Sequence, residues 1–281
     1  MFKKISIAVI GAGNMGEILI QGLLAAKVID ASRLSAVEIL PDRREDIKKT
    51  HGISVSEDMA AVRGKDIVII AVKPQVLDAT LAQLKEILVQ KQILISIAAG
   101  ISTQRITKDL GCEKKIPVVR VMPNACAQVL QGASALFAGE HAGRRELDLA
   151  KGIFDCVGRV TVVKKEWLMD VVTGLSGSGP AYVFLMIEAL SDAGVQIGLP
   201  RKVANMLAAQ TVYGAGKMFL ETGKPVSELK DLVATPGGTT FAGLKALEKG
   251  NFRSTVGDAV EAAAKRSREL GLLDPSELLG R

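Results

Sequence analysis

The segment from Leu229 to Thr240 reads LKDLVATPGGTT and combines hydroxyl side chains with two adjacent glycines. It contains no histidine, cysteine or cluster of metal ligands. Its backbone N–H groups would stand at the start of a helix expected from Phe241, where free N–H groups and the helix dipole favour an anion. The segment therefore suits a carboxylate-bearing ligand, although a simple turn between helices is the alternative interpretation.

A second candidate site is the motif GAGNMG, which spans Gly11 to Gly16 and matches G-x-G-x-x-G between a predicted strand and a predicted helix. Gly11 permits a tight turn, Gly13 lets the backbone approach a pyrophosphate, and Gly16 lets the helix pack closely on the strand. The motif predicts a bound nicotinamide dinucleotide. We include Asn14 and Met15, which complete it, in the predicted cofactor site.

The residue that reads the adenosine ribose should lie about 20 positions further on, at the end of the second strand. Glu38 stands there, and its carboxylate favours the free 2'-hydroxyl of NAD. Arg43 and Arg44 follow in PDRRED and could pair with the 2'-phosphate of NADP, or could be exposed residues of the next helix. The choice between NADH and NADPH stays open.

Further candidate cofactor residues follow other predicted strands, in AVKPQ, SIAAG and RVMPN. Ligands of doubly wound sheets lie outside the carboxyl ends of the strands. Lys73 could contact the cofactor, or could be a solvated lysine of the loop. Asn124 could form a hydrogen bond with the nicotinamide ribose or carboxamide. The residues predicted from these motifs are Ala71, Val72, Lys73, Pro74, Ala98 and Asn124.

The elements that position these motifs alternate between strand and helix, which predicts an α/β fold with a Rossmann-type, doubly wound and mostly parallel sheet. Apolar runs predict strands at 5–10, 35–39, 66–72, 92–97, 116–122, 133–138 and 158–163. Helical spacing predicts helices after the glycine motif and at 41–50, 74–89, 103–110 and 144–156. We therefore expect a dinucleotide-binding domain over residues 1–163.

Beyond Lys164 the strand pattern fades, and helical periodicity covers 181–196, 201–221 and 253–270. Residues 164–281 are expected to form an all-α substrate-binding and dimerisation domain. Small residues on one face of the middle helix permit close packing, and we expect part of this apolar half to be buried against a second subunit.

Composition narrows the class of protein. The net charge of +6 comes from scattered basic residues, and one Trp and two Tyr leave little for base stacking, which argues against nucleic-acid binding. No apolar run is long enough to predict a membrane span. Three cysteines without a CxxC pattern predict neither a disulfide framework nor a zinc site, so we expect no metal and a reducing cytoplasm. Both histidines, His51 and His141, are expected in loop-like surface positions.

GLSGSGPAYVF, from Gly174 to Phe184, is expected to be a glycine-rich bend before a long helix. Together with RVMPN and LVATPGGTT it resembles the pyrroline-5-carboxylate reductase family, and the resemblance runs from GAGNMG to about Leu270. It implies reduction of L-1-pyrroline-5-carboxylate to L-proline by NADPH or NADH, the last step of proline synthesis. It also implies a homodimer formed through the C-terminal helices, often within a larger ring.

By the same resemblance, the substrate loop lies between Thr235 and Thr240. Gly237 and Gly238 expose the backbone, the N–H groups of Thr239 and Thr240 and the side chain of Thr235 hold the carboxylate, and the Thr240 hydroxyl meets the ring nitrogen as the catalytic contact. A cyclic imine can enter already protonated, so the enzyme mainly has to align the hydride donor and the carbon. A loop with hydroxyls but no strong acid suits that task.

Two departures from related patterns matter. Ile39 and Leu40 stand where some members of the family carry serines that bind the 2'-phosphate, so the cofactor preference does not carry over. Val183 stands where β-hydroxyacid dehydrogenases carry a catalytic lysine after a GxxGxG bend, which argues against that activity. A dinucleotide sensor without catalysis is a further alternative, although it has no need for a second anion-binding loop.

Overall fold

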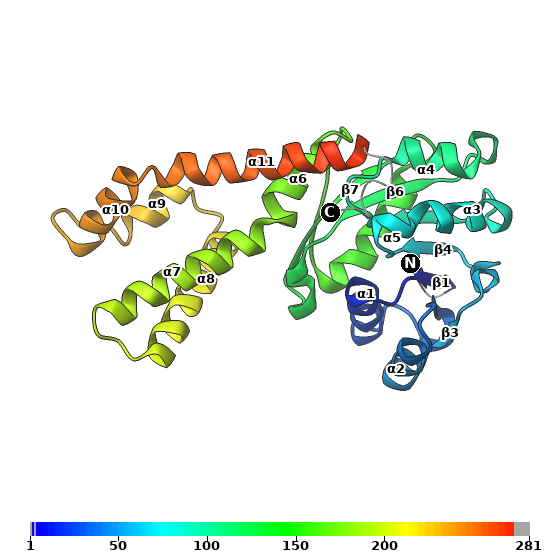
Figure 1. Ribbon diagram of the computed structural model, residues 1–281, viewed down its shortest axis with the longest axis horizontal. Helices are drawn as coiled ribbons and strands as arrows, with labels where there is room; N and C mark the ends of the chain where they lie inside the picture. Colours follow the sequence, from blue (N-terminus) through cyan, green and yellow to red (C-terminus); the bar gives the residue numbers. More distant parts are fainter. Residues whose placement is uncertain (1, 3, 273–281) are drawn as a thin grey trace. The chain divides into compact units, whose positions relative to one another are not determined.

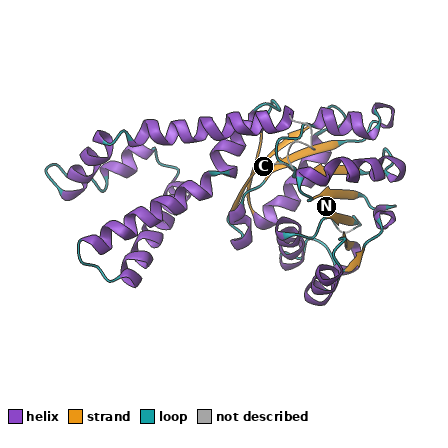
Figure 2. Cartoon of the chain, in the orientation of Figure 1, coloured by secondary structure: helices purple, strands orange, loops and turns teal. Residues whose placement is uncertain are grey.

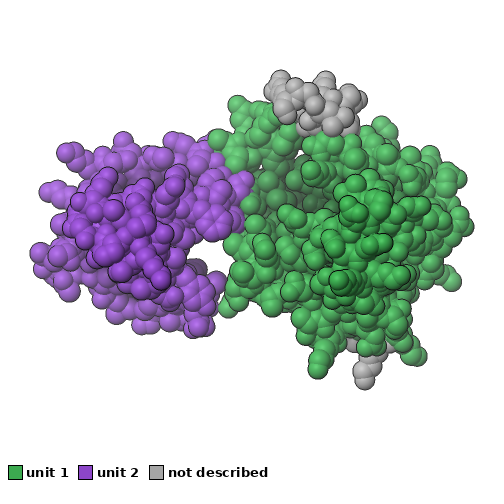
Figure 3. All heavy atoms as spheres, turned by 60° about the horizontal axis from the view of Figure 1, so that its bottom comes forward, with its two compact units in different colours: residues 1–177, 262–281 green, residues 178–261 purple. Residues whose placement is uncertain are grey.

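The computed structural model describes Phe2 and residues 4–272, which form two compact units. The first contains the chain up to Gly177 and the stretch from Ala262 onward, and the second contains Ser178–Glu261 (Figure 3). This division differs from the boundary expected at 163/164. Residues 164–177 and the last turns of the C-terminal helix belong with the first unit, where polar contacts described below hold them to the sheet.

Within residues 4–272, the strands of the first unit form one eight-stranded sheet in the order β3-β2-β1-β4-β5-β6-β7-β8. Neighbouring strands pair in parallel except for β6 and β7, which are antiparallel. The mostly parallel Rossmann-type prediction is therefore confirmed, and it includes the two closing strands. The strands are β1 Ile7–Ile10, β2 Leu34–Val37, β3 Ser54–Ser56, β4 Ile67–Ile70, β5 Ile93–Ser96, β6 Val118–Met122, β7 Gly132–Ala138 and β8 Gly158–Val162.

Helices cover both faces of this sheet (Figure 1). Alternate residues of a strand point to opposite faces, so Ile7 and Val9 of β1 enter one apolar cluster while Ala8 and Ile10 enter the other. The first cluster includes α1 Asn14–Ala25, α2 Pro41–His51 and α5 Arg144–Phe154, and the second includes α3 Leu77–Ile87 and α4 Thr103–Leu110. Strands buried on both faces explain the continuous apolar runs in the sequence.

The remaining elements are mainly helical (Figure 2). Single 3-10 turns lie at η1 Ala31–Arg33, η2 Met59–Val62, η3 Pro74–Val76, η4 Cys112–Lys114, η5 Ala125–Val129 and η6 Asp155–Val157. The longer elements are α6 Leu168–Val172, the π-helical turn η7 Thr173–Gly177, α7 Gly179–Gln196, α8 Arg201–Thr222, α9 Val226–Asp231, α10 Thr239–Lys249 and α11 Phe252–Leu272. In the described part of the chain, no helix has both the length and the apolar character to span a membrane.

The second unit has little interior of its own. Within residues 178–261, all of which the structure describes, only Ser191, Ala204 and Ala208 are buried. Large apolar side chains lie at its surface instead, including Phe184 at 63% exposed and Leu185 at 66%. Apolar exposure on this scale is typical of a surface that another protein chain covers.

Candidate cofactor and substrate sites

The glycine motif forms the connection between β1 and α1, and its first and last glycines are required by the packing. Gly11 has φ +87, and a side chain there would press on Val72 and on the carbonyl oxygen of Ala71. A side chain at Gly16 would overlap the carbonyl oxygen of Gly11. The two glycines therefore allow the tight turn and the close helix packing that the motif predicts.

Gly13 is different, because a Cβ atom added there meets nothing within 4 Å. It is the N-cap residue of α1 and supplies no side chain to the helix terminus. The N–H groups of Asn14, Met15 and Gly16 thus form an uncapped N-terminus beside open space, a geometry that suits a pyrophosphate.

Glu38 is the first residue after β2, and its carboxylate faces the glycine motif. Oε2 accepts a hydrogen bond from the Ala12 N–H at 2.9 Å, and Oε1 accepts one from the Leu40 N–H at 3.1 Å. The residue is only 9% exposed. The structure therefore places a fixed carboxylate beside the glycine motif, where the Rossmann pattern expects the adenosine ribose.

The two arginines after β2 have partners within the protein. Arg43 donates from Nε to the Ala12 carbonyl at 2.9 Å and forms an ion pair with Glu17. Arg44 donates to the carbonyl oxygens of Glu38 and Ile39 at 3.1 and 2.8 Å. Arg43 stays a predicted cofactor contact, and in the structure its guanidinium also holds the Ala12 carbonyl of the glycine motif.

Glu17 of α1 also contacts His51, whose Nε2 lies 3.1 Å from Glu17 Oε1. The expectation of a loop-like surface histidine was wrong, because His51 is the last residue of α2 and its side chain is 9% exposed. Burial acts to raise the pKa of the Glu17 carboxyl, but hydrogen bonds and charge from His51 and Arg43 outweigh it and lower that pKa. An ionised Glu17 therefore ties α1 to α2.

The segments after β4 and β5 contain the next predicted cofactor residues. Ala71 donates to the Ile10 carbonyl at 2.8 Å, which holds the start of AVKPQ against β1. Lys73 is exposed and its ammonium group makes no hydrogen bond or ion pair within the described residues, so this group is available to a ligand. Ala98 is 3% exposed and donates to Ser96 Oγ at 3.3 Å, so it shapes its loop from inside.

Asn124 has protein partners for its side-chain amide. Nδ2 donates to the Ser176 carbonyl at 3.0 Å, and Oδ1 accepts from the Ala133 N–H at 3.1 Å. With 8% exposure, the residue joins β7 to the turn η7. These contacts hold residues 173–177 beside β7, and the predicted contact of Asn124 with the nicotinamide stays a prediction.

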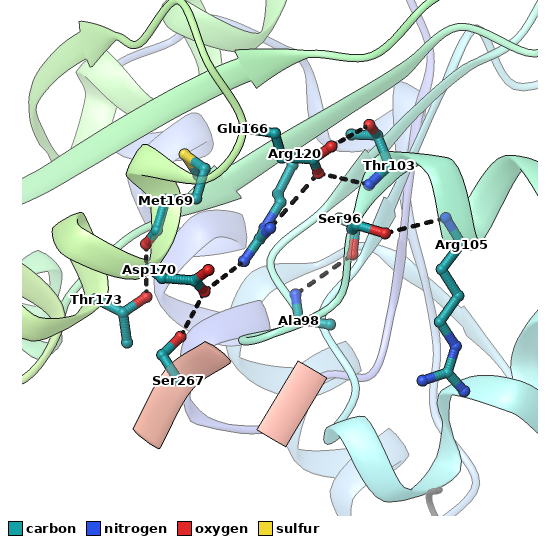
Figure 4. Close-up of polar contacts among 11 residues, drawn as sticks. Ser96, Ala98, Thr103, Arg105, Arg120, Glu166, Met169, Asp170, Thr173 and Ser267 are labelled. Carbon is teal, nitrogen blue, oxygen red and sulfur yellow. Dashed lines mark hydrogen bonds and ion pairs between the residues drawn. The ribbon is translucent and has the colours of Figure 1, made fainter. Parts of the chain in front are cut away.

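A buried charged network that the sequence interpretation missed lies near the same turn (Figure 4). Arg120 of β6 is 4% exposed, and its guanidinium lies 3.5 Å from Glu166 Oε1 and 3.6 Å from Asp170 Oδ1. Glu166 accepts hydrogen bonds from the Thr103 N–H and hydroxyl at 2.6 and 2.9 Å. Ser267 of α11 donates to Asp170 at 2.8 Å. The available signal was an arginine inside the otherwise apolar strand IPVVRVM.

The segment GLSGSG is a helical turn rather than the expected bend. Residues Thr173–Gly177 form a π-helical turn between α6 and α7. The hydroxyls of Thr173 and Ser176 donate to carbonyl oxygens one turn earlier, at 2.8 and 3.2 Å. Small residues allow this wide turn, and Gly177 in particular leaves room for Met122.

The threonine and glycine loop of the second unit also ends at an uncapped helix. Gly238 is the N-cap residue of α10, which begins at Thr239, two positions before the expected start. Gly237 has φ +72, and the Gly238 N–H is bonded to the Thr235 carbonyl at 2.9 Å, so the loop is a tight turn. A Cβ atom at Gly238 would overlap Thr235 Oγ1.

The polar groups of this loop are free for a ligand. No side chain caps α10, so the N–H groups of Thr239 and Thr240 lack a side-chain partner. The hydroxyls of Thr235, Thr239 and Thr240 make no hydrogen bonds within the described residues. Thr235 and Thr239 are exposed and Thr240 is half-buried. The loop therefore offers hydroxyls and an anion-binding helix N-terminus without an acid.

Comparisons with known proteins show which proteins this chain is similar to. Residues 166–270 match the family model described as pyrroline-5-carboxylate reductase dimerisation, and residues 6–100 match the one described as NADP oxidoreductase, coenzyme F420-dependent. The pyrroline-5-carboxylate reductase of Arabidopsis thaliana is 43% identical over 95% of this chain and 96% of its own length. That of Methanosarcina acetivorans is 45% identical over 94% of this chain and 97% of its own length.

Solved structures give the same result. The pyrroline-5-carboxylate reductase of Coxiella burnetii has a TM-score of 0.91 at 38% identity, covering 95% of this chain and 99% of that one. The Plasmodium falciparum pyrroline carboxylate reductase, solved with NADP bound, has a TM-score of 0.84 at 33% identity, covering 96% and 100%. A ketol-acid reductoisomerase from an uncultured archaeon, at 17% identity and a TM-score of 0.66, shares the fold alone.

Proposed function

The chain belongs to the pyrroline-5-carboxylate reductase family, and we propose that it reduces L-1-pyrroline-5-carboxylate to L-proline with NADH or NADPH. The observation that carries the proposal is the loop before α10, which presents an uncapped helix N-terminus and free threonine hydroxyls without an acid. These groups suit a substrate that combines a carboxylate with a protonated imine.

In this proposal the cofactor's pyrophosphate lies on the N-terminus of α1. Gly13 leaves the space, and the N–H groups of Asn14, Met15 and Gly16 donate to the phosphate oxygens. Gly11 supports the site by allowing the chain to turn beneath it. The bound reduced nicotinamide supplies the hydride.

The segment after β4 completes the proposed cofactor site. Ala71 and Val72 pack against Gly11, and Pro74 begins the turn η3 directly after Lys73. The free ammonium of Lys73 can then pair with an anionic group of the cofactor. Ala98 and Asn124 border the proposed cofactor site, and their protein partners hold their own segments in place.

The substrate's carboxylate is proposed to lie at the N-terminus of α10. The N–H groups of Thr239 and Thr240 and the hydroxyl of Thr235 hold it, and the N-terminal end of the helix dipole adds to the attraction. Gly237 and Gly238 keep that terminus free of side chains. The Thr240 hydroxyl accepts a hydrogen bond from the ring N–H of the protonated imine.

The proposed reaction needs little acid–base chemistry from the protein. Hydride adds to the carbon of the protonated C=N bond, the π electron pair moves to the ring nitrogen, and that nitrogen keeps the proton with which it arrived. The loop therefore has to orient the ring relative to the hydride donor, a positioning effect rather than a proton transfer.

We further propose that the working enzyme is a homodimer joined through its C-terminal helices, and that such dimers can associate into larger assemblies. The support is the exposed apolar surface of residues 178–261 and the match of residues 166–270 to the dimerisation model. A cytoplasmic location is proposed on the free thiols of Cys112, Cys126 and Cys156.

The test of the activity is the oxidation of NADH or NADPH by the purified protein with and without L-1-pyrroline-5-carboxylate. We expect oxidation to depend on the imine and proline to accumulate in equal amount. A protein that binds cofactor but oxidises it no faster with the imine would be a dinucleotide sensor, and the proposal would then be wrong.

A further inference from the structure

The adenosine end of the cofactor site contains a feature that bears on the choice between NADH and NADPH. These cofactors differ only at the 2'-position, where NADPH carries a phosphate in place of a hydroxyl. The residue that meets this position follows the second strand in a Rossmann-type sheet. Here that residue is Glu38, 9% exposed and directly after β2.

The Glu38 carboxylate is held in one orientation by two backbone donors. The Ala12 N–H contacts Oε2 at 2.9 Å, and the Leu40 N–H contacts Oε1 at 3.1 Å. A carboxylate has about four acceptor positions on its two oxygens, so each oxygen can accept one more hydrogen bond. The free hydroxyls of the NADH ribose are suitable donors, whereas a 2'-phosphate brings about two negative charges to the same carboxylate.

The neighbouring cations that could offset this repulsion have other partners. Arg43 is bonded to the Ala12 carbonyl and to Glu17. Arg44 is bonded to the carbonyl oxygens of Glu38 and Ile39, and its Nη2 lies 2.8 Å from Glu57 Oε2. These contacts hold both guanidinium groups in place and neutralise part of their charge, so neither is positioned to pair fully with a phosphate.

The other side chains near this turn provide few hydrogen-bond donors or cations for a 2'-phosphate. Ile39 is 75% exposed and Leu40 is 60% exposed, so apolar side chains stand where a phosphate would need donors. Lys73 follows β4, which pairs with the edge of β1 opposite to β2. Its ammonium group therefore belongs to the other side of the glycine motif.

From these contacts we propose that the cofactor site prefers NADH and that Glu38 is the residue that discriminates against the 2'-phosphate. The inference rests on the proposed function only in assuming that a nicotinamide dinucleotide occupies this site. Like charges brought together in a binding site cost several kcal/mol, so the dissociation constant of NADPH should exceed that of NADH by at least about tenfold.

The experiment measures the dissociation constants of NADH and NADPH by calorimetry on the full-length protein, with no imine present. Its outcome does not depend on catalysis, so a failure of the proposed reaction and a failure of this inference are distinguishable. We expect tighter binding of NADH, with the dissociation constant of NADPH at least about tenfold higher than that of NADH.

Two variants locate the effect. Glu38→Gln keeps the size of the side chain and removes its charge, so NADPH should bind more tightly. The ratio of the NADPH to the NADH dissociation constant should therefore fall several-fold. Glu45→Gln is the matched control, since it removes the same charge from an exposed position on α2. In this variant the ratio of the NADPH to the NADH dissociation constant should equal the wild-type ratio.

Three results would overturn the inference. Wild-type protein that binds NADPH as tightly as NADH would exclude the preference. A Glu38→Gln variant in which both affinities fall together at an unchanged ratio would make Glu38 a support of the glycine motif only. If the ratio of dissociation constants fell equally in Glu38→Gln and Glu45→Gln, the preference for NADH would depend on the net charge of the protein rather than on the Glu38 carboxylate.

Discussion

Gly13 and Gly16 belong to one motif but lie in different surroundings. We expect Gly13→Val to fold with near wild-type stability, because a Cβ atom there contacts nothing and the backbone is extended. It should fail to bind cofactor, because the side chain fills the space proposed for the pyrophosphate. The measurement is the melting temperature with and without NADH, since a ligand stabilises only a protein that binds it.

Gly16→Ala serves as the contrasting variant. Its methyl group would overlap the Gly11 carbonyl oxygen, so the variant should melt well below the wild type even without cofactor. If Gly13→Val still gains stability from NADH, the pyrophosphate lies elsewhere and the proposed cofactor site is wrong.

The hydroxyl of Thr240 tests the substrate loop. Thr240→Val keeps the shape of the side chain but removes the acceptor proposed for the ring N–H, so kcat/KM for the imine should fall by about tenfold or more. The affinity for NADH should not change. The measurement combines steady-state kinetics with the cofactor dissociation constant.

Thr240→Ser is the matched control, because it retains the hydroxyl and should keep most of the activity. The Thr240 hydroxyl makes no hydrogen bond within the described residues, so neither variant removes an internal side-chain hydrogen bond. Turnover by Thr240→Val at the wild-type rate would remove this residue from the catalytic site.

At the scale of elements, the Arg120 network joins β6 to α4, α6 and α11 through single side chains. Replacing Arg120 by Met leaves Glu166 and Asp170 partly buried without their cation. Breaking a buried ion pair in this way costs about 3–5 kcal/mol, so the urea midpoint should fall sharply at a fixed protein concentration.

Arg105→Met is the control for this prediction. Arg105 pairs with Asp78 at 2.8 Å and with Asp109 at 3.6 Å, but it lies near the surface. Exposed pairs of this kind contribute about 0–1 kcal/mol, so its urea midpoint should change little. Equal loss in the two variants would mean that the Arg120 contacts add nothing beyond a surface ion pair.

At the scale of the whole molecule, residues 178–261 expose large apolar side chains of the kind that a partner chain covers. We expect Leu185→Glu to weaken or abolish the dimer, because a charge would be buried at the interface without a partner. Light scattering coupled to size-exclusion chromatography measures the mass directly.

Val89→Glu is the matched control, since Val89 is 57% exposed and belongs to the first unit. It should leave the mass unchanged. A Leu185→Glu protein with the wild-type mass would show that this part of the helical surface is not the dimer interface.

Much of the fold could be predicted from the sequence because the relevant forces are local and periodic. Apolar runs of strand length, helical spacing and the glycine pattern gave the Rossmann-type sheet and the long helices correctly. Glycine positions such as Gly11 and Gly16 were readable for the same reason, since a tight turn and a close packing contact exclude other residues.

The sequence by itself thus determined the sheet, the helical second half, the family resemblance and the two candidate anion-binding loops. Only the tertiary structure decided which polar side chains have partners. Arg43 and Asn124, both predicted at the cofactor, also hold parts of the protein together, and Arg120 is a buried anchor that the sequence interpretation missed. Hydrogen bonds and ion pairs join residues far apart in the chain, and no local pattern specifies which pairs will meet.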